Sequence, residues 1–168
     1  NIPSENIIVR NCKMKNGHGG VVIGSEISGG YRNLFVENCQ MDSPNLDRVI
    51  RIKTSTCRGG IIENVFVRDI TVGQCREAVL GINLQYENRE NCNRNFPPVV
   101  RNVHLKNVTC EQSRLGVLII GLDDDQHVYN ISVEDSHFNN VAKGTNDIKG
   151  AKDVTVKNLY INGKLVKK

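Results

Sequence analysis

Two short segments of the sequence carry side chains of types that could do chemistry. His18 lies between two glycines at the start of an apolar run, and Arg51 and Lys53 flank a single isoleucine in a later apolar run. In a strand the two cations would project from the same face, because side chains alternate with a period of two residues. Two positive charges side by side repel each other, so the pair predicts an anionic group bound across them.

The overall composition favours an acidic polymer as the partner of these cations. The chain has 168 residues and a formal net charge of +4, which would help attract nucleic acid or an acidic polysaccharide. The cations are scattered among 18 acidic residues and only 5% of the residues are aromatic, so nucleic acid is the weaker of the two candidates. No run of residues is long and apolar enough to predict a membrane span.

The elements that must position these side chains are copies of one strand pattern. Each copy begins with Asn or Asp, alternates apolar and variable residues, and ends with a charged residue and a second Asn or Asp. The alternation predicts a strand with one buried face, and the second Asn or Asp tolerates the left-handed backbone of a tight bend. We expect these residues to stack as a ladder. The six residues, spaced 23 to 38 positions apart, are Asn11, Asn38, Asp69, Asn107, Asp135 and Asn158.

A further apolar run follows each bend and predicts another strand. These runs cover residues 20–25, 48–54, 78–86 and 116–122, with a weak counterpart at 141–144. Such a unit cannot bury its apolar face alone, but it can when it stacks on copies of itself at about 4.8 Å per coil. Apolar residues recur with a period of two rather than 3.6, which disfavours a helical solenoid. The sequence therefore predicts an all-β fold, a parallel β-helix of about six coils that forms one domain over residues 1–168.

The start of the chain lacks a cap for this β-helix. Only four residues precede the first repeat, whereas an uncovered first coil would invite edge pairing. We therefore expect the chain to be the C-terminal part of a longer β-helix, or to have its first coil covered by another chain.

The six cysteines lack the CxxC pairs and the Cys/His clusters of a zinc site. Cys12 and Cys39 occupy the same position in successive repeats, which predicts buried free thiols. Cys75 and Cys92 flank a loop and could be bridged, although the sequence leaves this open. The largest insertion, residues 87–98, is polar and ends in two prolines, which predicts a loop that could form a wall of a groove.

The two chemical segments, in this order and inside this repeat, resemble glycoside hydrolase family 28. These are the polygalacturonases and their pectin-cleaving relatives, and the resemblance covers nearly the whole chain through the repeats. It is carried by Gly17-His18-Gly19, then Ile23-Gly24-Ser25, and one coil later Arg51-Ile52-Lys53. The resemblance implies a right-handed β-helix that hydrolyses α-linked galacturonate bonds in pectin with inversion. It also implies a secreted or periplasmic protein that needs no cofactor and no metal.

The resemblance implies a role for each candidate residue. Inverting glycosidases use a carboxylic acid and a carboxylate roughly 6.5–9.5 Å apart, and catalytic His18 would lie beside the acid and hold its protonation state. Arg51 and Lys53 would bind the galacturonate carboxylate next to the scissile bond. Tyr86 is a weaker candidate for stacking on a sugar ring, with a tyrosine of the rim or core as the alternative.

One part of the family pattern is missing. The family's active-site aspartates lie in an Asn-Thr-Asp and an Asp-Asp segment upstream of the histidine, and this sequence contains neither there. The acidic run 123–125 lies three coils past His18, about 15 Å along the axis, and is typical of a turn. The aspartates would then come from upstream coils or a capping chain. Two alternatives stay open, a pectate lyase-like β-helix and a non-catalytic β-helical binder of pectin or another acidic polysaccharide.

Overall fold

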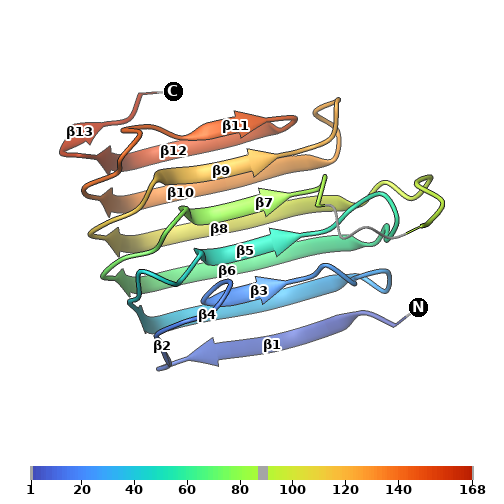
Figure 1. Ribbon diagram of the computed structural model, residues 1–168, viewed down its shortest axis with the longest axis horizontal. Coiled ribbons are helices and arrows are strands. Elements are labelled where there is room, and N and C mark those ends of the chain that lie inside the picture. The colour runs from blue at the N-terminus through green and yellow to red at the C-terminus, as the bar shows by residue number, and fades with distance from the viewer. Residues whose placement is uncertain (1, 87–90, 168) are drawn as a thin grey trace.

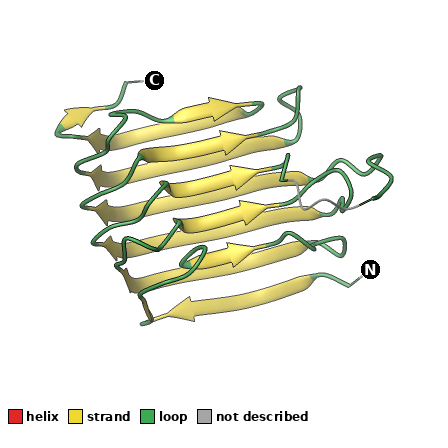
Figure 2. Cartoon of the chain, viewed as in Figure 1, coloured by secondary structure: helices red, strands yellow, loops and turns green. Residues whose placement is uncertain are grey.

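The chain coils into a right-handed parallel β-helix, seen from the side in the computed structural model of Figure 1. The structure describes residues 2–86 and 91–167. Within these ranges the regular elements are all strands (Figure 2), so no helix there could cross a membrane. The predicted all-β class and parallel β-helix are confirmed.

Two sheets enclose the core. The strands of the larger sheet are β1 (Ser4–Arg10), β2 (Lys13–Met14), β4 (Tyr31–Met41), β6 (Ile61–Val72), β8 (Val99–Cys110), β10 (Val128–Phe138), β12 (Lys152–Ile161) and β13 (Lys164–Leu165). Those of the smaller sheet are β3 (Val21–Ile23), β5 (Arg48–Lys53), β7 (Ala78–Asn83), β9 (Leu115–Ile120) and β11 (Asp147–Lys149). Successive coils are neighbours in each sheet and pair in parallel, except for the final antiparallel β13. The outer face of the smaller sheet is therefore built from one short strand per coil.

Aliphatic side chains in register fill the space between the sheets. Leu34, Val65, Val103 and Ile131 lie above one another on β4, β6, β8 and β10, and each is fully buried. The period of two selects them, because every second side chain of a strand points to the core. Burying each such side chain contributes about 1.5–3 kcal/mol, and this stacking makes the repeats stable only together.

The predicted ladder of Asn and Asp residues is present at one bend of each coil. All six residues have left-handed backbones, with φ between +48° and +57°. The side-chain amide of Asn38 donates to Asn11 at 2.8 Å, and that of Asn107 donates to Asp69 at 2.7 Å. The Asn or Asp side chains that these left-handed bends favour thus find hydrogen-bond partners on neighbouring coils.

A second ladder, which the sequence reasoning did not assign, lies five residues before the first. It is formed by the Asn that leads each of the first five copies, and φ at these positions lies between +55° and +59°. Amide hydrogen bonds of 2.8–3.0 Å join its members, which are Asn6, Asn33, Asn64, Asn102 and Asn130. The long strands of the larger sheet are consequently bent twice, and a short flat segment lies between the bends.

The weak strand predicted at 141–144 is wrong. Val141 forms only an isolated bridge with Ser113, and the amide of Gly144 donates to the carbonyl of Val141 at 2.9 Å, which closes a turn. Gly144 has a φ of +63°, so the segment bends instead of extending. The strand of this coil is β11, a few residues later.

The disulfide joins Cys57 to Cys92, and the bridge considered between Cys75 and Cys92 is wrong. The loop that carries Cys92 folds back onto the turn after β5, where the amide of Phe96 donates to the carbonyl of Thr56 at 3.0 Å. Cys75 is buried instead as a free thiol. Residues 91–98 contain no strand, as predicted for the insertion, and residues 87–90 lie outside the described residues.

The prediction of two buried thiols holds for one of the pair. Cys39 is free and buried, whereas Cys12 is free but exposed. The reason is that Cys12 belongs to the first coil, which a neighbouring coil covers on one side only.

Candidate functional site

The two predicted cations lie on the outer face of the smaller sheet. Ile52 between them is fully buried, so Arg51 and Lys53 both point away from the core. In register, Arg51 lies between Val22 of β3 and Gly81 of β7. The strand therefore places both charges side by side, as the sequence predicted.

The histidine segment of the preceding coil lies against these cations. The Nη1 atom of Arg51 donates a hydrogen bond of 2.9 Å to the main-chain carbonyl of His18. The His18 side chain is exposed, and its imidazole forms no hydrogen bond with the described residues. The two sequence motifs are thus joined through the backbone, which leaves the imidazole free for a ligand.

Each glycine beside the histidine has its own physical reason. Gly17 has a φ of +126°, which L side chains rarely adopt. A Cβ added at Gly19 would lie 2.6 Å from Cγ2 of Val22 and 3.2 Å from Cβ of Arg51. The second glycine therefore allows the loop to approach the cation strand closely.

Tyr86, just beyond the end of β7, also belongs to this cluster. The Nζ atom of Lys53 lies 4.4 Å from the centroid of its ring, and Cζ of Arg51 lies 5.9 Å from it. Cations at such distances are attracted to the face of an aromatic ring. The half-buried tyrosine thus supports the two cations at the rim of the site.

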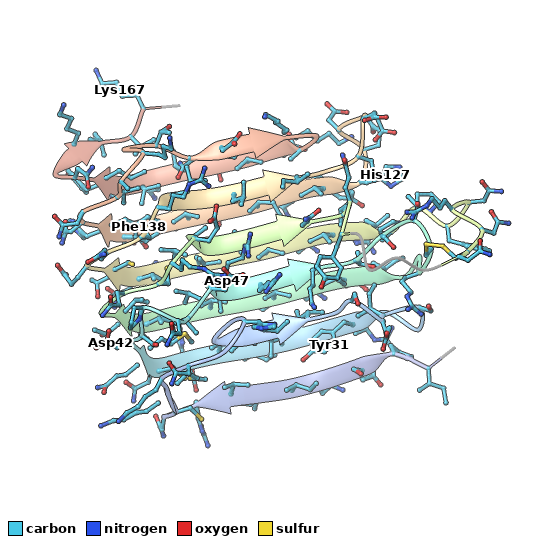
Figure 3. The ribbon with its side chains drawn as sticks, in the orientation of Figure 1. Tyr31, Asp42, Asp47, His127, Phe138 and Lys167 are labelled. Carbon is cyan, nitrogen blue, oxygen red and sulfur yellow. A yellow bond between two sulfur atoms is a disulfide. The ribbon has the colours of Figure 1, made fainter. Side chains whose placement is uncertain are left out.

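Asp47 is the residue of the site that sequence reasoning missed (Figure 3). It is 8% exposed and its carboxylate forms ion pairs with three arginines. These are Arg48, Arg51 at 3.1 Å and Arg76 at 2.9 Å. Its main-chain amide also donates to the carbonyl of Gly17 at 3.1 Å. A signal was present in the sequence, because an acid directly before a run of outward cations is the simplest partner for them.

The pKa of Asp47 follows from these neighbours. Burial acts to raise the pKa, but the hydrogen bond from Arg76 and the charges of Arg48 and Arg51 outweigh it, so the pKa lies below its usual value of 3.8. The pKa of Arg51 is also lowered, first by burial and then by repulsion from Arg48. Asp47 is therefore ionised and fully engaged.

Positive charge remains in excess. Arg48, Arg51 and Lys53 carry three positive charges on this face, and among the described residues Asp47 is the carboxylate that forms ion pairs with the first two, which leaves +2. Arg48, Arg51 and Lys53 together line a small pocket of about 20 Å³. Within the described parts of the chain no group of three or more His, Cys, Asp or Glu residues could hold a metal ion. The arrangement suits an anionic ligand.

The acidic run 123–125 lies in the turn after β9, three strands away from β3 in the smaller sheet. A carboxylate oxygen of Asp124 accepts a hydrogen bond of 2.9 Å from the main-chain amide of Gln126. This confirms the predicted acidic turn, and the run takes no part in the site.

Comparison with known proteins agrees with this architecture. The model of the family described as glycosyl hydrolases family 28 matches residues 1–120. A solved structure of a hyperthermoactive exopolygalacturonase from Thermotoga maritima matches with a TM-score of 0.87 and 35% identity over 96% of this chain. The match covers 35% of that protein, so this chain spans about a third of its length. No curated protein sequence matches. The extent of the family match, with its order of motifs on a parallel β-helix, means that this chain belongs to glycosyl hydrolases family 28.

Proposed function

We propose that this chain is the substrate-carboxylate-binding part of a polygalacturonase-type glycoside hydrolase that acts on pectin. The observation that carries the proposal is the joining of His18 to Arg51 on a face that also holds Lys53 and Tyr86. Substrate for such a face must be anionic, and the similar solved protein is an exopolygalacturonase. A galacturonate unit of pectin satisfies both conditions.

The geometry of Arg51 supports this choice of ligand. Its Nη1 atom serves both His18 and Asp47, while its Nε and Nη2 atoms have no hydrogen-bond partner among the described residues. Two parallel N–H donors match the two oxygens of a carboxylate and give strong charge-assisted hydrogen bonds. Lys53 would add a point charge beside them, steered by the ring of Tyr86.

The hydrolysis itself needs carboxylates that this face does not offer. An inverting glycosidase requires an acid and a base roughly 6.5–9.5 Å apart, with the pKa of the acid raised. Asp47 fails this requirement because its pKa is lowered and its oxygens are occupied by arginines. Our proposal therefore includes catalytic aspartates from outside this chain, on upstream coils or a partner, with the free imidazole of His18 beside the acid.

The location of the protein forms part of the same proposal. Pectin is met outside the cytoplasm, so we expect a secreted or periplasmic protein. The disulfide between Cys57 and Cys92 supports this, since such bonds persist mainly in oxidising compartments.

The test is hydrolysis by the full-length native protein and by its His18→Ala variant. We expect release of reducing ends from polygalacturonate, with a product of inverted anomeric configuration by NMR. The variant should bind the polymer normally but release reducing ends at least about 100-fold more slowly, in line with loss of general acid–base assistance.

A second candidate is a non-catalytic binder of acidic polysaccharide. It is favoured by the observation that the carboxylate paired with these cations is one that arginines already occupy. Binding of polygalacturonate without any release of reducing ends would select it over the hydrolase. Unsaturated products would instead point to a lyase.

A further inference from the structure

We infer that Arg48 is a third substrate-binding cation, and that Arg48 and Arg51 bind the same free carboxylate of a hexuronate. This inference rests on the proposed function and adds a specificity-determining residue to it. Arg48 begins β5 and lines the same small pocket as Arg51 and Lys53. None of the motifs that indicated the site includes it.

The backbone of β5 explains how Arg48 reaches this face. Residues three apart in a regular strand point to opposite faces. Here Val49 and Ile50 are both fully buried, so the alternation is interrupted and Arg48 turns outward like Arg51. Its side chain is 18% exposed, close to the 14% of Arg51, which places both guanidinium groups at a similar depth.

Gly81 provides the space that Arg48 occupies. It lies directly beside Arg51 in register on the next coil, at an outward-facing position without a side chain. A Cβ added there would lie 2.3 Å from Cδ and 2.8 Å from Nε of Arg48. The side chain of Arg48 therefore lies across this position, in the column of residues that contains Arg51.

The charges show what the arrangement lacks. Arg48 and Arg51 share the Oδ2 atom of Asp47, while Arg76 contacts its Oδ1 atom. Two partly buried guanidinium groups on one oxygen leave positive charge uncompensated, which is costly away from water. Apolar Leu118 and Ile120 also line the pocket, and charge contacts are stronger beside apolar groups than in open water. A ligand carboxylate would supply the missing negative charge, whereas its methyl ester would leave the positive charge in excess of Asp47 uncompensated.

The experiment measures binding of trigalacturonate and of its fully methyl-esterified form to the full-length native protein by calorimetry. We expect Arg48→Ala to weaken binding of the free acid roughly 10-fold or more, as expected for a lost charge-assisted hydrogen bond. Binding of the ester should change by less than about 2-fold. Gly81→Ala should also weaken binding of the free acid, because it displaces Arg48 without removing its charge.

Arg76→Ala is the matched control. Arg76 contacts the same carboxylate, but it does not line the pocket and is 68% exposed. Its loss should change the affinity for the free acid by less than about 2-fold, which separates a binding role of Arg48 from an indirect effect through Asp47. If Arg48→Ala does not fold, Arg48→Gln keeps a donor for Asp47 and carries the same expectation.

The outcomes separate this inference from the proposed function. Weaker binding in Arg51→Ala together with unchanged binding in both Arg48→Ala and Gly81→Ala would overturn the role of Arg48 and leave the proposed function standing. Equal affinity of the wild-type protein for the acid and its ester would instead contradict the proposed function, and the role of Arg48 with it.

Discussion

The guanidinium of Arg51 donates a 2.9 Å hydrogen bond to the main-chain carbonyl of His18, which lies 33 residues earlier in the sequence. A second hydrogen bond of 3.1 Å, from the amide of Asp47 to the carbonyl of Gly17, joins the same two segments. The strand that carries the cations therefore also holds the loop that carries the histidine. The position of His18 would thus depend on the same contacts that position Arg51 for binding the substrate carboxylate.

The first prediction concerns selectivity for charge. Arg51→Ala and Lys53→Ala should each weaken binding of polygalacturonate roughly 10-fold or more, because each removes a charge-assisted contact with the carboxylate. Binding of neutral galactan should change little. Isothermal calorimetry with both polymers makes the comparison, and an equal loss for both would rule out the carboxylate contact.

Arg51→Lys should fare no better than Arg51→Ala in this assay. A lysine keeps the charge, but it lacks the fork that serves His18 and Asp47 while it presents two donors to a ligand. Full rescue by lysine would show that charge alone suffices.

The second prediction concerns Asp47 and pH. The pKa of Asp47 is below 3.8 in the folded protein, because its arginine contacts outweigh the effect of burial. Its ionised form thus contributes stability above the unfolded pKa, and this contribution is lost as the pH falls below 3.8 through the folded value. Asp47→Asn should lower the free energy of unfolding by about 3 kcal/mol or more near neutral pH, since it leaves buried cations uncompensated.

Urea unfolding of both proteins at a series of pH values makes this measurement. The difference between wild type and Asp47→Asn should shrink as the pH falls below 3.8. Glu77→Gln, which removes the partner of the more exposed Arg114, is the matched control and should cost about 1 kcal/mol or less. A difference that grows towards acid pH would contradict the lowered pKa.

The third prediction concerns the ladder at the bends. Asn38 has a φ of +51° and its amide donates to Asn11. Asn38→Ala should destabilise the protein by about 2 kcal/mol, through the strain of a left-handed alanine and the lost hydrogen bond. Asn38→Gly also loses the hydrogen bond, but glycine adopts a left-handed backbone without strain. Thermal unfolding should therefore show a loss of stability of only about 1 kcal/mol. Equal costs for the two variants would mean that strain is unimportant there.

The fourth prediction concerns the disulfide. Cys57 and Cys92 close a loop with a separation of 35 residues, so replacing both with serine should lower the free energy of unfolding by about 2–4 kcal/mol. Cys12→Ser, at an exposed free thiol, should cost nothing measurable. Peptide mapping without reduction should recover the Cys57–Cys92 linkage, and a Cys75–Cys92 peptide would contradict it.

The coils and their register could be predicted, because they follow from local patterns that are visible in the sequence. Alternation of apolar residues marks the strands, and Asn or Asp marks the bends, because few other residues adopt the left-handed backbone. The leading Asn or Asp of each copy obeys the same rule, and the second ladder could have been assigned from it. The disulfide was harder, because it depends on how an irregular loop folds back rather than on any periodicity.

The site was predictable only where its residues belong to the regular pattern. Arg51 and Lys53 follow the period of two, so their shared face could be deduced. Arg48 breaks that period, and nothing in the residues themselves shows that two consecutive apolar side chains would both turn inward. Asp47 lies directly before the strand, so a contact with its cations could have been suggested from the sequence, but its contact with Arg76 follows only from the stacking of the next coil.

The second ladder connects residues separated by 27, 31, 38 and 28 positions, yet its hydrogen bonds all measure 2.8–3.0 Å. Coils of different length thus stack on one another with the same hydrogen-bond geometry. A segment could be inserted or exchanged between β7 and β8 without moving β5 relative to β3. Evolution, or a protein engineer, can therefore change the loops beside this pocket while the cationic face keeps its position.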